Sequence, residues 1–253
     1  MTSRRTRLPK RRRVVDAVAS QLRGVDADLE ASHTFDELLK LPVEEWPAFL
    51  ATRPSRRTES LVARLIAEGR REVPNQPARA LAMFTAAEGV TNSLKDAIRL
   101  ARYRGVLAKE RAHALRILRR YAEALAEVDS AEAFLSHVPA SEYDLTFVRW
   151  TRATVLFDLG RYSEALDLAV TVVRSFEEFE DIEYAHQTRI LVADLLRERG
   201  AVDDALAMYR ELHGYFEEQE DDEITPALAK RIADCEAHLG RQATTAKRST
   251  STS

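Results

Sequence analysis

Small and apolar residues recur along this chain at an interval of about forty positions. Four Ala-Leu pairs are spaced by 44, 41 and 40 residues, at Ala80-Leu81, Ala124-Leu125, Ala165-Leu166 and Ala205-Leu206. A second series of alanines, spaced by 41, 40 and 40 residues, stands at Ala112, Ala153, Ala193 and Ala233. Gly160, Gly200 and Gly240 each follow a member of this second series by seven residues. Each repeat therefore holds two helix-forming segments separated by a turn signal.

The repeated glycine and alanines predict a pair of antiparallel helices in each unit. A glycine ends the first helix because it adopts the left-handed conformation without a steric penalty. An alanine on each helix lets the two backbones approach closely, and larger residues one turn later pack against the next unit. A period of this length with two helices per repeat is typical of an α-solenoid. We therefore expect an all-α fold.

The third repeat carries the most specific pattern. Its segment Gly160-x-Tyr162-x-x-Ala165, followed by apolar residues four and seven positions further on, resembles a tetratricopeptide repeat (TPR) of the longer-helix kind. Repeat two has Arg119 in place of the glycine, and repeat one has Pro77 in place of the tyrosine. The resemblance implies a right-handed α-solenoid with helical caps at both ends. A HEAT-like helical array also fits the period, but the Gly-x-Tyr-x-x-Ala segment favours the TPR.

The N-terminal part of the chain differs from the repeats. Residues 1–13 contain seven basic residues and no acid, which predicts a disordered basic arm. Its twin arginine is not followed by an uninterrupted apolar segment, because Asp16 interrupts it, so we do not expect an export signal. Residues 14–56 contain short apolar segments that should form helices packing on the first repeat. One of these helices is expected to start at Pro42.

The solenoid is expected to cover residues 57–241 with about four helix pairs. Its last segment, residues 225–241, is predicted to be a first helix without a partner, which would cap the open end of the stack. Residues 242–253 are expected to be a disordered polar tail. No apolar run approaches the roughly 18 residues that a membrane span needs, so no membrane association is expected.

Composition and motifs argue against an enzyme. The single Cys235 excludes an internal disulfide and a cysteine metal cluster, and it fits a reducing compartment, hence a cytoplasmic protein. No two of the six histidines are three or four positions apart, which disfavours a helical metal site. The chain has neither a Gly-rich phosphate loop nor a Gly-x-Ser-x-Gly segment. We therefore predict no catalytic residue, no metal and no cofactor. The excess of arginine over lysine suggests a GC-rich, bacterial genome.

In TPR arrays the first helix of each pair lines a concave groove, so the resemblance implies a partner-binding surface there. The candidate residues, counted from the small residues of the first helices, are Arg102, Lys109, His113, Arg116, Trp150, Thr154, Phe157, Asp194 and Arg197. The heptad spacing of Arg102, Lys109 and Arg116 predicts one basic stripe. Trp150 and Phe157 should also share a helix face. The competing interpretation is that the two aromatic residues only pack against neighbouring helices.

This surface predicts a protein or peptide partner that carries acids and one large apolar anchor. The family's carboxylate clamp for chaperone tails is disfavoured, because His113, Thr151, Gln187 and Leu191 stand where its Asn, Lys and Arg residues are expected. Our first hypothesis is thus a non-enzymatic scaffold or adaptor.

The alternative hypothesis is a nucleic-acid-associated or transcription-regulatory protein. It would use the basic arm and the basic helix over residues 99–120, although the chain after residue 13 is net acidic. The acidic segments Glu177–Glu183 and Glu217–Glu223 could instead receive the arm of the same or another copy, so self-association is a further possibility.

Overall fold

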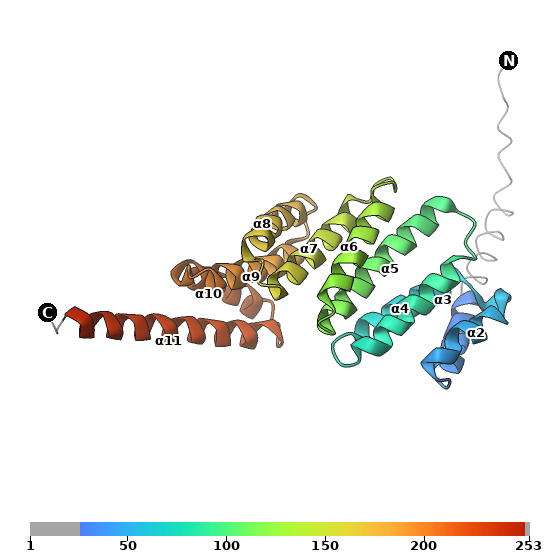
Figure 1. The fold of residues 1–253 in the computed structure, drawn as a ribbon, viewed down its shortest axis with the longest axis horizontal. Helices are drawn as coiled ribbons and strands as arrows, with labels where there is room; N and C mark the ends of the chain where they lie inside the picture. Colours follow the sequence, from blue (N-terminus) through green and yellow to red (C-terminus); the bar gives the residue numbers. More distant parts are fainter. Residues whose placement is uncertain (1–25, 251–253) are drawn as a thin grey trace, which may run out of the picture. The chain divides into compact units, whose positions relative to one another are not determined.

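The computed structural model describes residues 26–250, with side chains up to residue 242, and in this part of the chain it consists of helices without strands (Figure 1). A helix covers residues 26–38. It is followed by η1 (Val43–Glu45), α2 (Trp46–Ala51), η2 (Pro54–Arg56), α3 (Glu59–Glu72), α4 (Pro77–Thr91), α5 (Ala97–Ile117), α6 (Tyr121–Leu135), α7 (Glu142–Asp158), α8 (Tyr162–Glu178), α9 (Ile182–Glu198), α10 (Val202–Glu218) and α11 (Ile224–Thr250). None of these helices has the length and apolar character that crossing a bilayer requires.

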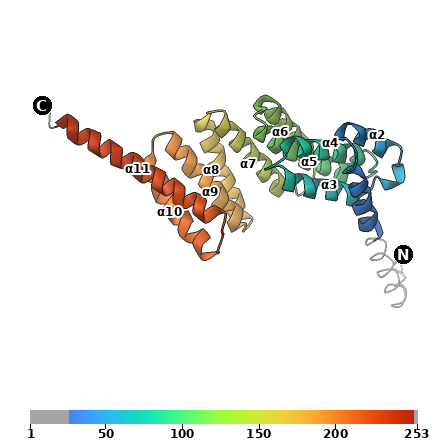
Figure 2. The same cartoon turned by 90° about the horizontal axis from the view of Figure 1, so that it is seen from below.

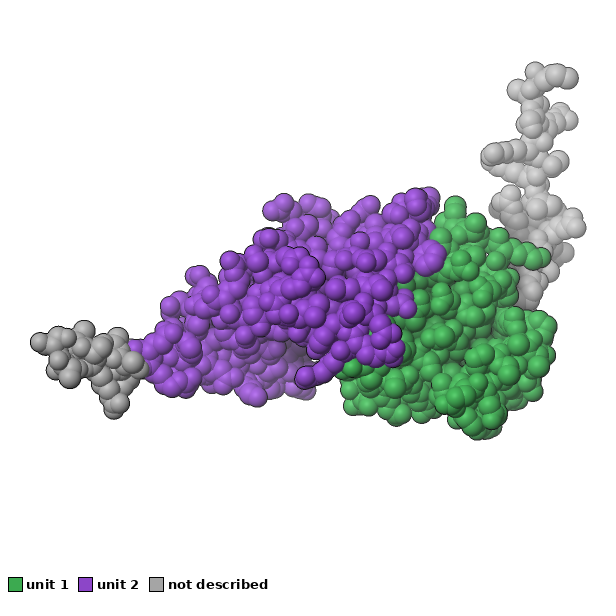
Figure 3. All heavy atoms as spheres, in the orientation of Figure 1, with its two compact units in different colours: residues 1–118 green, residues 119–253 purple. Residues whose placement is uncertain are grey.

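The helices form two compact units, residues 1–118 and residues 119–253 (Figure 3). Unit 1 contains the helices up to α5, and unit 2 contains α6 to α11. In both units each helix packs mainly against its neighbours in the sequence. This nearest-neighbour packing is the arrangement predicted from the forty-residue period.

Unit 2 confirms the predicted helix pairs. Gly160 and Gly200 follow the last residues of α7 and α9 by two positions, and their φ angles of 72° and 87° lie in the left-handed region. Each pair has one alanine of the repeated pattern on each of its helices. These alanines are completely buried: Ala153 and Ala165 in one pair, and Ala193 and Ala205 in the next. Neighbouring backbones can therefore approach closely at these positions.

Other turns adopt the same conformation without glycine. Arg119, which stands in the glycine position of the second repeat, has φ 60°, and Glu180 and Glu220 behind α8 and α10 have φ 58° and 56°. A left-handed L-residue costs roughly 1–2 kcal/mol, so the packing of the flanking helices must offset this strain. Position in the repeat, rather than residue type alone, determines where the chain turns.

Unit 1 has one continuous core. Phe35 and Leu38 of the first helix and Trp46 of α2 pack in the same buried cluster as residues of α3 and α4. Gly69 of α3 lies against the ring of Phe84 so closely that a β carbon at residue 69 would overlap it. The short N-terminal helices thus cover part of the first full helix pair.

The two ends differ from the expected boundaries. Pro42 precedes η1, a single 3-10 turn, and the α-helix starts four residues later, at Trp46. At the other end, α11 does not stop near Arg241 but continues to Thr250, past the end of α10 (Figures 1 and 2). Gly240 therefore lies within α11 and does not end a helix. The predicted arm, residues 1–13, lies outside the described residues.

We expect the glycines of unit 2 to respond oppositely to alanine. Gly160→Ala should lower the free energy of unfolding by about 1 kcal/mol, because alanine resists the left-handed conformation. Gly214→Ala, in the middle of α10, should raise it by about 0.5–1 kcal/mol through helix propensity. Nothing lies within 4 Å of a β carbon at either position, so each change reports on the backbone alone. Urea unfolding measures both, and equal effects of the two substitutions would contradict the assigned turn.

Candidate functional site

α5 carries the four candidate residues of unit 1. Asp96 caps this helix by accepting hydrogen bonds from the backbone N–H groups of Ile98 and Arg99, both at 3.0 Å. Arg102 is exposed, whereas Lys109, His113 and Arg116 are half-buried. The three basic residues therefore share one helix, as their spacing predicts, but they do not share one environment.

Lys109 belongs to a buried ion cluster. Its Nζ lies 2.5 Å from the Glu110 carboxylate, and a terminal nitrogen of Arg70 from α3 lies 2.6 Å from the same oxygen. Burial of Glu110 raises the pKa of its carboxyl, but Lys109 and Arg70 outweigh burial, so the pKa lies below its usual range. Glu110 remains charged, and Lys109 and Arg70 share its carboxylate within unit 1.

Other cations of α5 also pair with carboxylates. Arg111, which is 8% exposed, places a guanidinium nitrogen 2.8 Å from Glu88 of α4. Arg99 contacts Glu59 of α3 at 3.1 Å. These contacts join α5 to the preceding helix pair and reduce the positive charge that the helix presents to a partner.

His113 is held in its neutral form. Burial, together with the positive charges of Arg116 and Lys109, lowers the pKa of its imidazole to about 4, although Glu110 acts in the opposite direction. At neutral pH His113 can therefore bind a partner only as an uncharged group. This differs from the basic character of its neighbours on the helix.

α7 carries the three candidate residues Trp150, Thr154 and Phe157, all half-buried. Trp150 contacts the rings of Phe147 and Tyr184, with centroids 6.4 and 6.3 Å away. Phe157 instead contacts Tyr162 of α8 at 5.8 Å. The two aromatic residues therefore belong to different clusters, although they are seven positions apart.

The indole N–H of Trp150 is buried and has no hydrogen-bond acceptor among the described residues. An N–H group in this state costs roughly 1–3 kcal/mol. By contrast, the Thr154 hydroxyl donates to the Thr151 carbonyl at 2.7 Å within α7. Thr154 thus satisfies its polar group locally, and Trp150 does not.

The aromatic cluster around Trp150 and Phe147 extends to exposed residues that the repeat spacing does not predict. Tyr143 at the start of α7 contacts the rings of Phe147 and Phe179, and its hydroxyl donates to Asp181 at 2.5 Å. Tyr143, Phe179 and Ile182 are 39%, 43% and 47% exposed. The only sequence signal is a local excess of aromatic residues between 143 and 184. Their contact depends on how α7, α8 and α9 pack.

α9 carries Asp194 and Arg197. The side chain of Asp194 is 13% exposed and accepts hydrogen bonds from the Tyr209 hydroxyl of α10 at 2.6 Å and from Arg231 Nε of α11 at 2.9 Å. Arg197 pairs with Glu198 at 2.9 Å and lies 3.9 Å from Asp194. Burial and the Asp194 hydrogen bond raise the pKa of Tyr209. This network joins three helices.

The structure thus places the nine predicted residues on α5, α7 and α9. α7 and α9 are the first helices of the pairs that they form with α8 and α10. α7 and α9 contact each other, so the residues of these two helices lie on neighbouring elements of unit 2. Within the described part of the chain, no cluster of His, Cys, Asp and Glu side chains could hold a metal ion.

Neither a family model nor a curated protein matches this chain. Two solved structures of TPR-like repeats do, both from a Podosopora anserina protein described as a kinesin light chain. One, a point variant, superposes with a TM-score of 0.55 at 15% identity over 77% of this chain and 92% of that chain. The other gives 0.50 at 15% identity over 80% and 98%. The protein therefore has the fold of the TPR-like helical repeat proteins.

We expect the stability of the chain to depend on His113. The unfolded imidazole has a pKa near 6.5 and the folded one near 4, so the unfolded state binds more protons as the pH falls through this window. The free energy of unfolding should therefore fall by roughly 3 kcal/mol between pH 6.5 and pH 4, at about 1.36 kcal/mol per pKa unit. In urea unfolding across this pH range, the free energy of unfolding should fall less for His113→Asn than for the native chain. Parallel curves for the two proteins would disprove the assignment.

We expect Asp194 to stabilise unit 2 through Arg231. Asp194→Asn should lower the free energy of unfolding by roughly 3 kcal/mol, because it leaves a half-buried arginine without its carboxylate. In a double-mutant cycle with Arg231→Met, the two changes should couple by about 1–3 kcal/mol. Asp234→Asn, at an exposed position of α11, serves as the control and should change stability by less than about 0.5 kcal/mol. Additive effects would show that the pair is not coupled.

Proposed function

We propose that this protein is a non-enzymatic scaffold or adaptor that binds a segment of another protein along the first helices of its repeats. The observation that carries the proposal is the cluster of aromatic residues from α7, α8 and α9, which reaches the surface at Tyr143 and Phe179. TPR-like repeats generally bind protein partners. The sequence motifs offer no nucleophile, phosphate loop or metal site for an enzyme, and the single cysteine fits a cytoplasmic protein.

The cluster favours a partner with an apolar anchor. Trp150 and Phe147 are half-buried, and aromatic residues of this kind dominate the energetics of many interfaces. A carbonyl group of a bound segment would be a suitable acceptor for the Trp150 indole N–H if the surrounding rings shift slightly. The partner's apolar side chain and its backbone would then be recognised at neighbouring points of α7.

The predicted acidity of the partner depends on the basic stripe of α5. The predicted basic stripe was made of Arg102, Lys109 and Arg116, but Lys109 already pairs with Glu110. The nucleic-acid alternative loses support for the same reason, because Lys109 and Arg111 of α5 both contact carboxylates. Residues 1–13, on which that alternative and self-association also depend, lie outside the described residues. We therefore base the proposal on the apolar anchor.

Two threonines provide a matched test of this surface. Thr154 on α7 and Thr171 on α8 each donate a hydroxyl hydrogen bond to a carbonyl of the preceding turn. Thr154→Arg would place a bulky charge between the Trp150 and Phe157 positions, whereas Thr171→Arg would place it on an exposed second helix. In affinity capture from native extract, done with and without nuclease treatment, a specific partner should be retained by Thr171→Arg and lost with Thr154→Arg.

The outcomes separate the alternatives. Retention of the same partner by both variants would show that binding does not involve α7. Loss of the partner on nuclease treatment alone would support the nucleic-acid function. Thermal unfolding of both variants must first show that each is folded, so that a loss of binding reports on the surface.

A further inference from the structure

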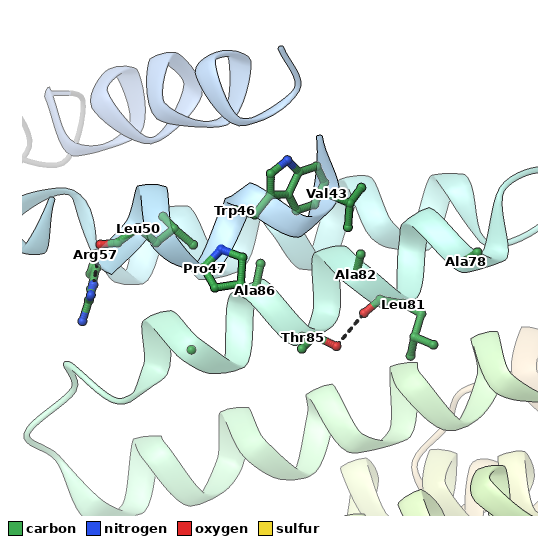
Figure 4. Close-up of a pocket in the computed structure, with 11 residues that line it drawn as sticks. Val43, Trp46, Pro47, Leu50, Arg57, Ala78, Leu81, Ala82, Thr85 and Ala86 are labelled. Carbon is green, nitrogen blue, oxygen red and sulfur yellow. Dashed lines mark hydrogen bonds between the residues drawn. The ribbon is translucent and has the colours of Figure 1, made fainter. Parts of the chain in front are cut away.

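Unit 1 contains an apolar groove between α2 and α4, away from the first helices discussed above. Trp46, Pro47 and Leu50 line it from α2, and Leu81, Ala82 and Thr85 line it from α4 (Figure 4). Its volume is about 440 Å³. This is within the range of pockets that hold ligands or side chains of a partner.

The groove exists because α2 is short. α2 has 6 residues and α4 has 15, which correspond to lengths of roughly 9 and 22 Å at 1.5 Å per residue. A helix of α2's length cannot cover the full face of α4. Leu81 and Ala82 consequently remain half-buried, and Thr85 and Gly89 remain exposed.

Unit 2 shows how the corresponding groove differs when both second helices are long. Between α8 and α10 lies a smaller groove of about 270 Å³, which includes Val170 and Met208. Arg189 of α9 lines this groove and contacts Glu177 of α8 at 3.1 Å and Glu211 of α10 at 3.2 Å, so it bridges the two second helices. In the groove of unit 1 the only charged lining residue is Arg57, and no such bridge crosses it among the described residues.

The shape of the α4 wall suits a helix. Ala78, Ala82, Thr85 and Gly89 follow one another at spacings of four, three and four, so small side chains form one face of α4. A β carbon at residue 89 would contact nothing within 4 Å. Small residues on one helix allow a second helix to pack at short distance, with its larger side chains between them.

The charges at the two ends give the groove a polarity. Arg57 lies at the end near Leu50, and its Nε donates to the Leu50 carbonyl at 2.8 Å. Arg57 makes no ion pair with a carboxylate of the described residues, so its remaining N–H groups can bind an acceptor. At the other end, η1 contains Glu44 and Glu45 beside Val43. A helix that runs from Val43 towards Arg57 would place its positive N-terminus near the acids and its negative C-terminus near the arginine.

We propose that this groove docks a short amphipathic α-helix of a partner protein, with an apolar ridge and a carboxylate in its last turn that binds Arg57. The site lies on α2 and α4 and is separate from the surface of α7 and α9. A helix of about three turns matches the open length of α4. The groove thus adds a second docking point, of defined polarity, to the interaction module.

Selection from a helical peptide library tests the proposal. A displayed library of 14-residue peptides, with random apolar ridges and random charges at both ends, is selected on the full chain. Enriched peptides should share an apolar ridge and a Glu or Asp in the last turn. The best peptide, labelled and measured by fluorescence anisotropy, should bind Ala82→Arg at least about tenfold more weakly because the new side chain fills the groove. Ala67→Arg, at an exposed position of α3, should bind like the native chain.

A charge exchange tests the role of Arg57. Arg57→Glu should weaken binding of the acidic peptide by about tenfold, and a peptide with Lys in place of the acid should recover binding to this variant. Absence of enriched peptides, equal binding to Ala82→Arg, or no preference for an acid would each overturn the proposal. So would a dimer of the chain that Ala82→Arg dissociates, because the occupant would then be a second copy. None of these results affects the comparison of Thr154 with Thr171.

Discussion

The close approach of paired helices at buried small residues is the constraint on which the structure depends. Ala153 and Ala165 have no exposed surface, nor do Ala193 and Ala205. A helix of 17 residues cannot bury enough apolar area by itself, so each helix must pack on its neighbours. Small residues at the contact allow dense packing between the pairs. The left-handed turns after α7 and α9 then return the chain along the helix it has just formed.

Polar side chains connect the helices that this packing brings together. Asp194 joins α9 to α10 and α11, and Glu110 joins α5 to Arg70 of α3. Each carboxylate is largely buried and needs its cation, since an unpaired buried charge is strongly destabilising. The same side chains project from the first helices, where a groove would bind a partner. Structural pairing therefore limits which of the predicted residues can contact a ligand.

The sequence predicts the repeated elements well because their signal is local. The alanine series and the glycines mark two helices and a turn. Arg119, which replaces the glycine in repeat two, adopts the left-handed conformation in the structure, which its residue type does not predict. Contacts between repeats are harder to predict from the sequence. Seven-residue spacing places Trp150 and Phe157 on one helix face, but the partners of each ring come from other helices. Likewise, a basic stripe can be read from spacing, whereas the pairing of Lys109 with Glu110 requires the burial of that acid.

The ends of a repeat array have different surfaces from its interior for a physical reason. Between two long second helices, a side chain of the first helix can contact both, as Arg189 of α9 contacts Glu177 of α8 and Glu211 of α10. Where α2 stops after six residues, it leaves part of one face of α4 uncovered within the described part of the chain, and the small residues Ala82, Thr85 and Gly89 line the groove there. Truncation of one helix thus creates a groove without any change in the helix beside it. A repeat protein can acquire a second docking surface in this way while the packing of its interior repeats is preserved, because each repeat depends mainly on its neighbours.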